Sequence, residues 1–198
     1  MVVLLMVHFL HQKRLNAGEI HMVECCVANA NVVSSSLTIR SMQERLEKLG
    51  LRVEGDFTLH SGAKASVKWD IEKLHSDYAL HERLFYLRPW HREILKFIRG
   101  RDILIVGVPT GGYYLAMDFA EHYKLRYAHP KYHLNESSKK WNAIVIDDVL
   151  TTGTTVKEYF DKVHVLAVAV LVNRSKLTKI NNKPIISGFF ADEVNTVS

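Results

Sequence analysis

The most constraining feature of the sequence is one stretch, residues 142–155, in which apolar residues run directly into two acids and then into hydroxyls. A continuous apolar run rich in Ile and Val is typical of a strand that is buried on both faces of a parallel sheet. Asp147 and Asp148 would then lie at the carboxyl end of that strand, where open α/β sheets bind their ligands. Residues 151–155 predict a tight turn into a helix that continues to Phe160.

Two kinds of chemistry meet in this stretch. Gly153 lets the backbone approach a ligand closely or adopt positive φ, and amide N–H groups at the start of a helix form an anion site. Hydroxyl side chains next to this glycine can donate further hydrogen bonds: Thr151, Thr152, Thr154 and Thr155. Asp147 and Asp148 are acceptors suited to sugar hydroxyls or hydrated Mg²⁺. The expected ligand is therefore a sugar phosphate.

Residues 145–155, Val-Ile-Asp-Asp-Val-Leu-Thr-Thr-Gly-Thr-Thr, resemble the phosphoribosyl-pyrophosphate (PRPP) signature of type I phosphoribosyltransferases. The resemblance implies that Asp147 and Asp148 contact the ribose hydroxyls and that residues 151–155 bind the 5-phosphate. The alternative is an ordinary strand–turn–helix with two solvated acids. No Gly-Lys-Ser/Thr follows a glycine run, so the sequence does not support a P-loop NTPase.

Residues 55–70 predict a β-hairpin, because apolar and polar residues alternate on both sides of a Ser-Gly turn. Residues 57–64 resemble the amino-terminal hood of orotate phosphoribosyltransferases, which frames the base, and the resemblance places Lys64 at the substrate. His60 stands where many members have a base-contacting lysine, and residues 65–68 replace a Ser-Pro-Tyr segment and a following aromatic. A different base, and a merely solvated Lys64, are the alternatives.

A second buried strand is predicted over residues 102–108, followed by a Pro-Thr-Gly-Gly turn and a helix over 113–123. Paired glycines permit close backbone approach at a helix start, which again suits an anion. The turn resembles the pyrophosphate loop of the family. The resemblance therefore assigns three residues to pyrophosphate binding: Thr110, Gly111 and Gly112.

The polar segment 129–140 is predicted to be a mobile loop. The family carries a flexible catalytic loop here, and Lys131 and His133 match its Lys-x-His element, without the preceding Arg-Lys pair or the following glycine. The resemblance implies that Lys131 contacts pyrophosphate and that Lys131 or His133 supplies loop electrostatics or proton transfer. His129 and His133 could instead bind zinc if they were helical, but no other ligand cluster accompanies them.

Further elements complete an alternating strand–helix pattern, which predicts an α/β fold with a largely parallel central sheet flanked by helices. Strands are expected over 163–172 and 183–190, and a helix over 41–51. A helical pattern over 76–99 is expected to be divided by Pro89. Arg174 follows the strand 163–172 and matches the family arginine that contacts the acidic side of the base; the alternative is a surface arginine.

Length and composition set the remaining expectations. The 198 residues favour one domain with an appended segment. The resemblance implies that this is a phosphoribosyltransferase domain over 39–198, with a small hood over about 39–75 and a core over about 76–190, preceded by an extension over 1–38 of unclear role. A net charge of +5 suits a polyanionic small substrate without indicating nucleic acid. Adjacent Cys25 and Cys26 predict no structural disulfide and a cytoplasmic setting. The apolar start of the chain is too short to span a membrane.

The resemblance as a whole predicts an orotate phosphoribosyltransferase-like enzyme of pyrimidine nucleotide biosynthesis. Such an enzyme transfers ribose 5-phosphate from PRPP to orotate and gives orotidine 5′-monophosphate and pyrophosphate. The family further implies Mg²⁺ as cofactor, carried mainly by PRPP with no dedicated protein metal site, and a homodimer. Two other readings remain open: a phosphoribosyltransferase for another base, and a PRPP- or nucleotide-sensing binding protein without turnover.

Overall fold

The computed structural model describes residues 42–58, 62, 64–129, 134 and 136–191, all of which belong to the part of the chain that begins at Ile39. The extension predicted over residues 1–38 lies outside the described residues.

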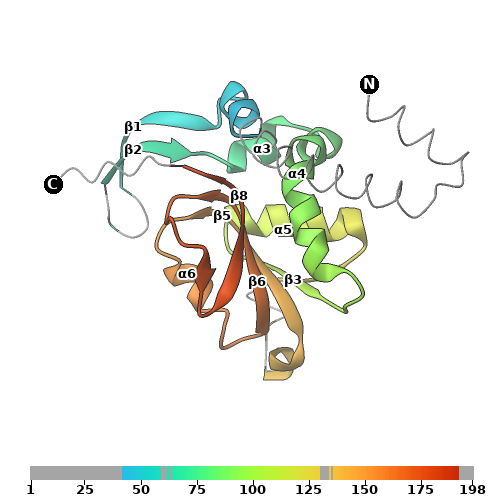
Figure 1. The fold of residues 1–198 in the computed structure, drawn as a ribbon. Coiled ribbons are helices and arrows are strands. Elements are labelled where there is room, and N and C mark those ends of the chain that lie inside the picture. The colour runs from blue at the N-terminus through green and yellow to red at the C-terminus, as the bar shows by residue number, and fades with distance from the viewer. Residues whose placement is uncertain (1–41, 59–61, 63, 130–133, 135, 192–198) are drawn as a thin grey trace, which may run out of the picture. The chain divides into compact units, whose positions relative to one another are not determined.

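The described residues form a central sheet of six strands in the order β4-β3-β5-β6-β8-β7 (Figure 1). All neighbouring strands pair in parallel except β7 and β8, which are antiparallel. The expected mainly parallel α/β architecture is therefore confirmed. The strands of this sheet are β3 (Leu104–Gly107), β4 (Arg126–Ala128), β5 (Asn142–Leu150), β6 (His164–Asn173), β7 (Lys179–Ile180) and β8 (Lys183–Phe190).

Strand β5 lies between β3 and β6 and is buried on both faces, as its apolar run predicts. Ile144 and Ile146 face the core cluster that includes helices α4 (Leu80–Ile98) and α5 (Gly111–Tyr123). Ala143 and Val145 face the opposite cluster, which is closed by α6 (Thr154–Lys157) and the turn after it. The sheet is thus covered on both sides, and its strand ends are the edges left for a ligand (Figure 1).

The hood consists of a helix over residues 42–48, the antiparallel pair β1 (Arg52–Thr58) and β2 (Lys64–Trp69), and the short helix α3 (Glu72–Asp77). The predicted helix and hairpin are both confirmed. Side chains of β2 alternate strictly between exposed and buried, so that one face of the hairpin packs on the core. A two-stranded sheet has little stability by itself, and this packing is what holds it.

The helical region around Pro89 differs from the expectation. Helix α4 runs unbroken through Pro89, and the actual break lies earlier, at the extended residues Tyr78 and Ala79 between α3 and α4. Proline removes the hydrogen bond to the carbonyl four residues before it, that of Phe85, and its ring crowds that carbonyl. The helix nevertheless continues, because Leu87 and Trp90 on either side of Pro89 are buried in the core and hold it in place.

The helix after the central motif is also shorter than expected. Helix α6 ends at Lys157 instead of Phe160. The chain continues in tighter turns, in which the amide of Tyr159 donates to the carbonyl of Val156 at 3.1 Å and the amide of Phe160 to that of Lys157 at 3.1 Å. Tyr159 is buried in the core beneath the sheet, and this packing decides the local conformation.

Candidate active site

A cavity of about 430 Å³ lies where the carboxyl ends of β3 and β5 meet the hood. The hood contributes one wall through β1, β2 and α3, and the turn between β3 and α5 contributes another. The acids and the threonine loop after β5 complete the lining. The lining residues are Phe57, Thr58, Lys68, Trp69, Asp70, Ile71, Glu72, Val108, Pro109, Thr110, Gly111, Asp147, Asp148, Val149, Thr151, Thr155 and Arg174.

The two acids at the end of β5 differ in environment. Asp147 is 8% exposed, and its Oδ1 accepts a hydrogen bond from the amide of Asp148 at 2.9 Å. Asp148 is half-buried, and its Oδ1 accepts from the amide of Val149 at 2.8 Å. Burial, and then the neighbouring charge of Asp148, raise the pKa of Asp147 well above its ordinary value. The two neighbouring carboxyls therefore border the same cavity in different environments, one buried and one half-buried.

The glycines of the β3–α5 turn let this turn lie directly against the two acids. A side chain on Gly112 would place its Cβ 2.7 Å from the Cα of Asp147 and 2.6 Å from the carbonyl oxygen of Ile146. A side chain on Gly111 would overlap the carboxylate of Asp148. Only glycine fits at either position, so the sequence pair fixes the approach of the turn to the acids. Among the candidate pyrophosphate residues, Thr110 and Gly111 line the cavity directly.

The threonine loop begins where β5 ends. Gly153 adopts φ 75°, a conformation that favours glycine, and the first turn of α6 follows. The hydroxyls of Thr152 and Thr154 lie 3.0 Å apart, while Thr151 and Thr155 line the cavity. The loop therefore has both hydroxyl donors and a positive-φ turn at the cavity edge.

Arg174 is a buried cation of this site. It is 4% exposed, and its Nη1 donates to the carbonyl of Val67 on β2 at 3.1 Å. The preceding residue, Asn173, organises the turn after β6: its side-chain amide donates to the carbonyl of Leu177 at 2.8 Å and to Ser187 at 2.9 Å. The alternative that Arg174 is a surface arginine is therefore wrong, because the side chain is enclosed between β6 and the hood.

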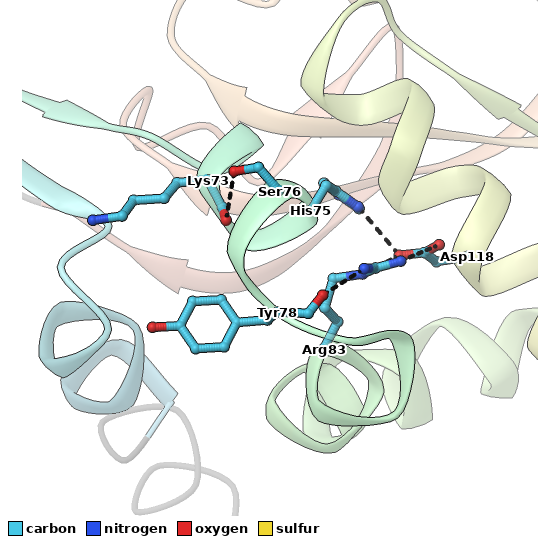
Figure 2. Close-up of polar contacts among 6 residues, drawn as sticks. All are labelled: Lys73, His75, Ser76, Tyr78, Arg83 and Asp118. Carbon is cyan, nitrogen blue, oxygen red and sulfur yellow. Dashed lines mark hydrogen bonds and ion pairs between the residues drawn. The ribbon is translucent and has the colours of Figure 1, made fainter.

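Helix α3, which borders the cavity through Glu72, also contributes His75 to a buried polar network. Figure 2 shows this network, with His75 and Arg83 both directed at Asp118. Asp118 on α5 is 3% exposed, and its carboxylate accepts hydrogen bonds from Nε and Nη2 of Arg83 at 2.8 and 3.0 Å. The same carboxylate lies 3.3 Å from Nδ1 of His75. Burial raises the pKa of Asp118, but the hydrogen bonds from His75 and Arg83 outweigh it and leave the pKa lowered. One turn before His75, Glu72 accepts a hydrogen bond from the hydroxyl of Thr110 at 2.6 Å.

The sequence does not indicate this network, because Asp118 and Arg83 lie 35 residues apart and meet only in the folded chain. It ties the short helix α3 to both α4 and α5, and Arg83 also donates to the carbonyl of Tyr78 in the break between α3 and α4 at 2.7 Å. Helix α3 is too short to be stable in isolation. Its position beside the cavity therefore depends on these contacts.

The hood lysines are placed differently from the expectation. Lys64, the residue that the resemblance assigns to the substrate, donates to the hydroxyl of Thr58 at 2.8 Å and is not among the residues that line the cavity. Lys68, four residues later on β2, does line it. Lys131 and His133 lie outside the described residues, as does any zinc site that includes His133.

The described residues contain no cluster of three or more His, Cys, Asp or Glu side chains that could hold a metal ion. Within the same residues, no helix has the length and apolar character needed to cross a membrane.

Comparison with known proteins finds one curated relative over part of the chain. No family model matches the chain. The orotate phosphoribosyltransferase of Aeropyrum pernix is 28% identical over 128 residues, which are 56% of this chain and 63% of that protein. The chain thus spans less than two thirds of the curated relative that it matches.

Solved structures agree in fold. The crystal structure of the Aeropyrum pernix orotate phosphoribosyltransferase matches with a TM-score of 0.62 and 24% identity, over 75% of this chain and 93% of that one. The UMP synthase of Leishmania donovani matches with a TM-score of 0.62 and 20% identity, over 89% of this chain and 41% of that one. The adenine phosphoribosyltransferase of Rhodothermus marinus matches with a TM-score of 0.54 and 15% identity, over 77% of this chain and 99% of that one. The predicted resemblance to type I phosphoribosyltransferases, and to orotate phosphoribosyltransferases among them, is confirmed.

Proposed function

Because the chain has a phosphoribosyltransferase-like fold, we propose that it transfers the ribose 5-phosphate group of PRPP to orotate. The observation that carries the proposal is one cavity bordered by three elements: the acid pair after β5, the threonine loop and the β3–α5 glycine turn. These elements suit the hydroxyls, the 5-phosphate and the pyrophosphate of PRPP respectively. No P-loop or metal cluster competes for this assignment among the described residues.

The proposed chemistry separates charge, and the cavity contains groups for each part. As pyrophosphate leaves, positive charge builds on the sugar ring, and the carboxylate of Asp148 lies where it can stabilise that charge. Asp147 and Asp148 accept hydrogen bonds from the ribose hydroxyls. Residues 151–155 hold the 5-phosphate through amide and hydroxyl donors, and Thr110–Gly112 hold pyrophosphate through backbone amides. On the resemblance to the family, Lys131 contacts pyrophosphate, and Lys131 or His133 supplies loop electrostatics or proton transfer.

Mg²⁺ is proposed as the cofactor, bound mainly through PRPP. Carboxylate oxygens of the kind that Mg²⁺ prefers border the cavity, from Asp70, Glu72, Asp147 and Asp148. When bound, the ion would neutralise developing charge on pyrophosphate. A cytoplasmic location and a homodimer are proposed on the resemblance to the family.

Orotate is favoured as the acceptor for two reasons. The curated relative and two of the matched structures carry the names orotate phosphoribosyltransferase and UMP synthase. The cavity also has a buried cation, Arg174, which can pair with the carboxylate of an acidic base. A second candidate, a PRPP-sensing protein without turnover, is favoured by the departures of the segment 129–140 from the family loop.

The test is pyrophosphate release from PRPP and Mg²⁺ by the full chain, with and without orotate and with a panel of other bases. Orotate-dependent release is expected. The Asp147→Asn, Asp148→Asn double variant should lose both release and the PRPP-induced rise in melting temperature, while Asp161→Asn, an exposed acid of the turn after α6, should retain both. If pyrophosphate were released only with another base, that base would replace orotate as the proposed acceptor. PRPP binding without release from any base would favour the sensor, and an unchanged double variant would disprove the site.

A further inference from the structure

We infer that Lys68 is a specificity-determining residue of the cavity and contacts the anionic substituent of the acceptor base. This inference rests on the proposed function and extends it, since it assigns the hood cation to a position at which the sequence resemblance has none. The residue that the resemblance indicates, Lys64, has a different role in the structure.

The alternation of side chains along strand β2 places Lys64 and Lys68 on the same face. Residues 64, 66 and 68 are exposed, and residues 65, 67 and 69 are buried, as alternation along a strand requires. Four residues separate Lys64 from Lys68, which corresponds to about 13 Å along the strand. The two lysines therefore carry the same charge on the same face of the same strand, and they differ in their position along β2.

Their partners differ as well. The ammonium of Lys64 donates to the hydroxyl of Thr58, the residue directly opposite in the hairpin, and Lys64 does not line the cavity. Lys68 lines the cavity and forms no hydrogen bond or ion pair with any side chain that the structure describes. A cation that borders a cavity without an internal partner is available to an anionic ligand.

Arg174 fixes the location of Lys68. The guanidinium donates to the carbonyl of Val67, which immediately precedes Lys68, and both cations border the same cavity. Acids border the cavity as well: Asp70 and Glu72 from the hood, and Asp147 and Asp148 from the end of β5. Lys68 and Arg174 are the basic residues of the lining, and they are the groups that can pair with the carboxylate of a planar base.

The test measures binding of two ligands that share a ring and differ in charge: orotate, and uracil, which lacks the carboxylate. Calorimetric titration of the full chain in the presence of magnesium pyrophosphate gives the dissociation constants without turnover. Lys68→Gln should weaken orotate binding about tenfold, because one charge-assisted hydrogen bond is lost. It should leave the weaker binding of uracil unchanged.

Lys64→Gln is the matched control, and its orotate dissociation constant should remain within about twofold of the wild-type value, because its hydrogen bond to Thr58 is solvent-exposed. Equal losses from both variants, or none from Lys68→Gln, would overturn the inference, as would a wild-type chain that does not bind orotate. Orotate binding that depends on Lys68, without pyrophosphate release from PRPP, would retain the inference and reject the proposed turnover.

Discussion

His91 offers a quantitative test of how the core of this protein responds to pH. The side chain lies on α4, is 1% exposed, and packs against the rings of Phe119 and Tyr123 at centroid distances of 4.9 and 5.7 Å. Neither ring nitrogen has a hydrogen-bond partner among the described residues. Burial, and then the nearby His122, lower the pKa of His91 from 6.5 to about 3, although Asp118 acts in the opposite direction.

The lowered pKa makes the free energy of unfolding depend on pH in a defined direction. Above pH 6.5 the imidazole is neutral in both folded and unfolded chains, and the contribution to stability is fully present. Below pH 6.5 the unfolded chain binds a proton that the folded chain does not, so stability falls as pH falls toward 3. At pH 5 this linkage costs about 2 kcal/mol relative to pH 7.5.

Urea unfolding of the wild type and of His91→Leu at pH 7.5, 6 and 5 measures this contribution. Leucine cannot titrate, so the difference in unfolding free energy between the two proteins should shift by about 2 kcal/mol in favour of the variant between pH 7.5 and 5. His81→Leu, an exposed histidine on the same helix, is the control for general effects of losing an imidazole. If the free energy of unfolding depended on pH in the same way for the wild type and for His91→Leu, the folded protein would accommodate a charged His91. That result would refute the reasoning.

Three further variants test the site and its support. Asp118→Asn should destabilise the protein by about 3 kcal/mol in urea unfolding, because it leaves the enclosed guanidinium of Arg83 without its counter-charge; a loss below the measurement error would contradict a structural role for the network. Gly112→Ala should abolish PRPP binding, measured as the ligand-induced rise in melting temperature, because its Cβ would lie 2.7 Å from the Cα of Asp147; normal binding would mean that the turn can move away. Asp147→Asn should stabilise the ligand-free protein increasingly as pH rises above the ordinary value of 3.8, because burial raises the pKa of this acid and its ionised form is disfavoured in the fold; a pH-independent difference in urea unfolding would count against that shift.

The sheet and the centre of the site could be predicted from the sequence because their signals are local. The apolar run before Asp147 indicates a doubly buried strand, and the acids that follow it must lie at the strand's carboxyl end. The close approach of Gly112 is likewise implied by a glycine pair between a strand and a helix. Each of these inferences needs only neighbouring residues.

Other parts depend on contacts between distant segments, which a single sequence does not reveal. The alternation along β2 identifies the exposed face of the hairpin, but it does not say which end of that face borders the cavity. The resemblance therefore points to Lys64, and nothing in the sequence singles out Lys68. A local rule predicts that Pro89 divides a helix, because it takes no account of tertiary packing, here the burial of Leu87 and Trp90 in the core. The partnership of His75 with Asp118 spans elements that meet only after folding.

The contact between Arg174 and Val67 has a consequence for how the hood can change during evolution. It joins strand β2 of the hairpin to the residue after β6 through a buried cation. A hairpin exchanged between relatives would have to present a carbonyl to the same guanidinium, or leave that charge buried without it. An exchange of the hairpin therefore involves the end of β6 as well, because the two segments share this contact.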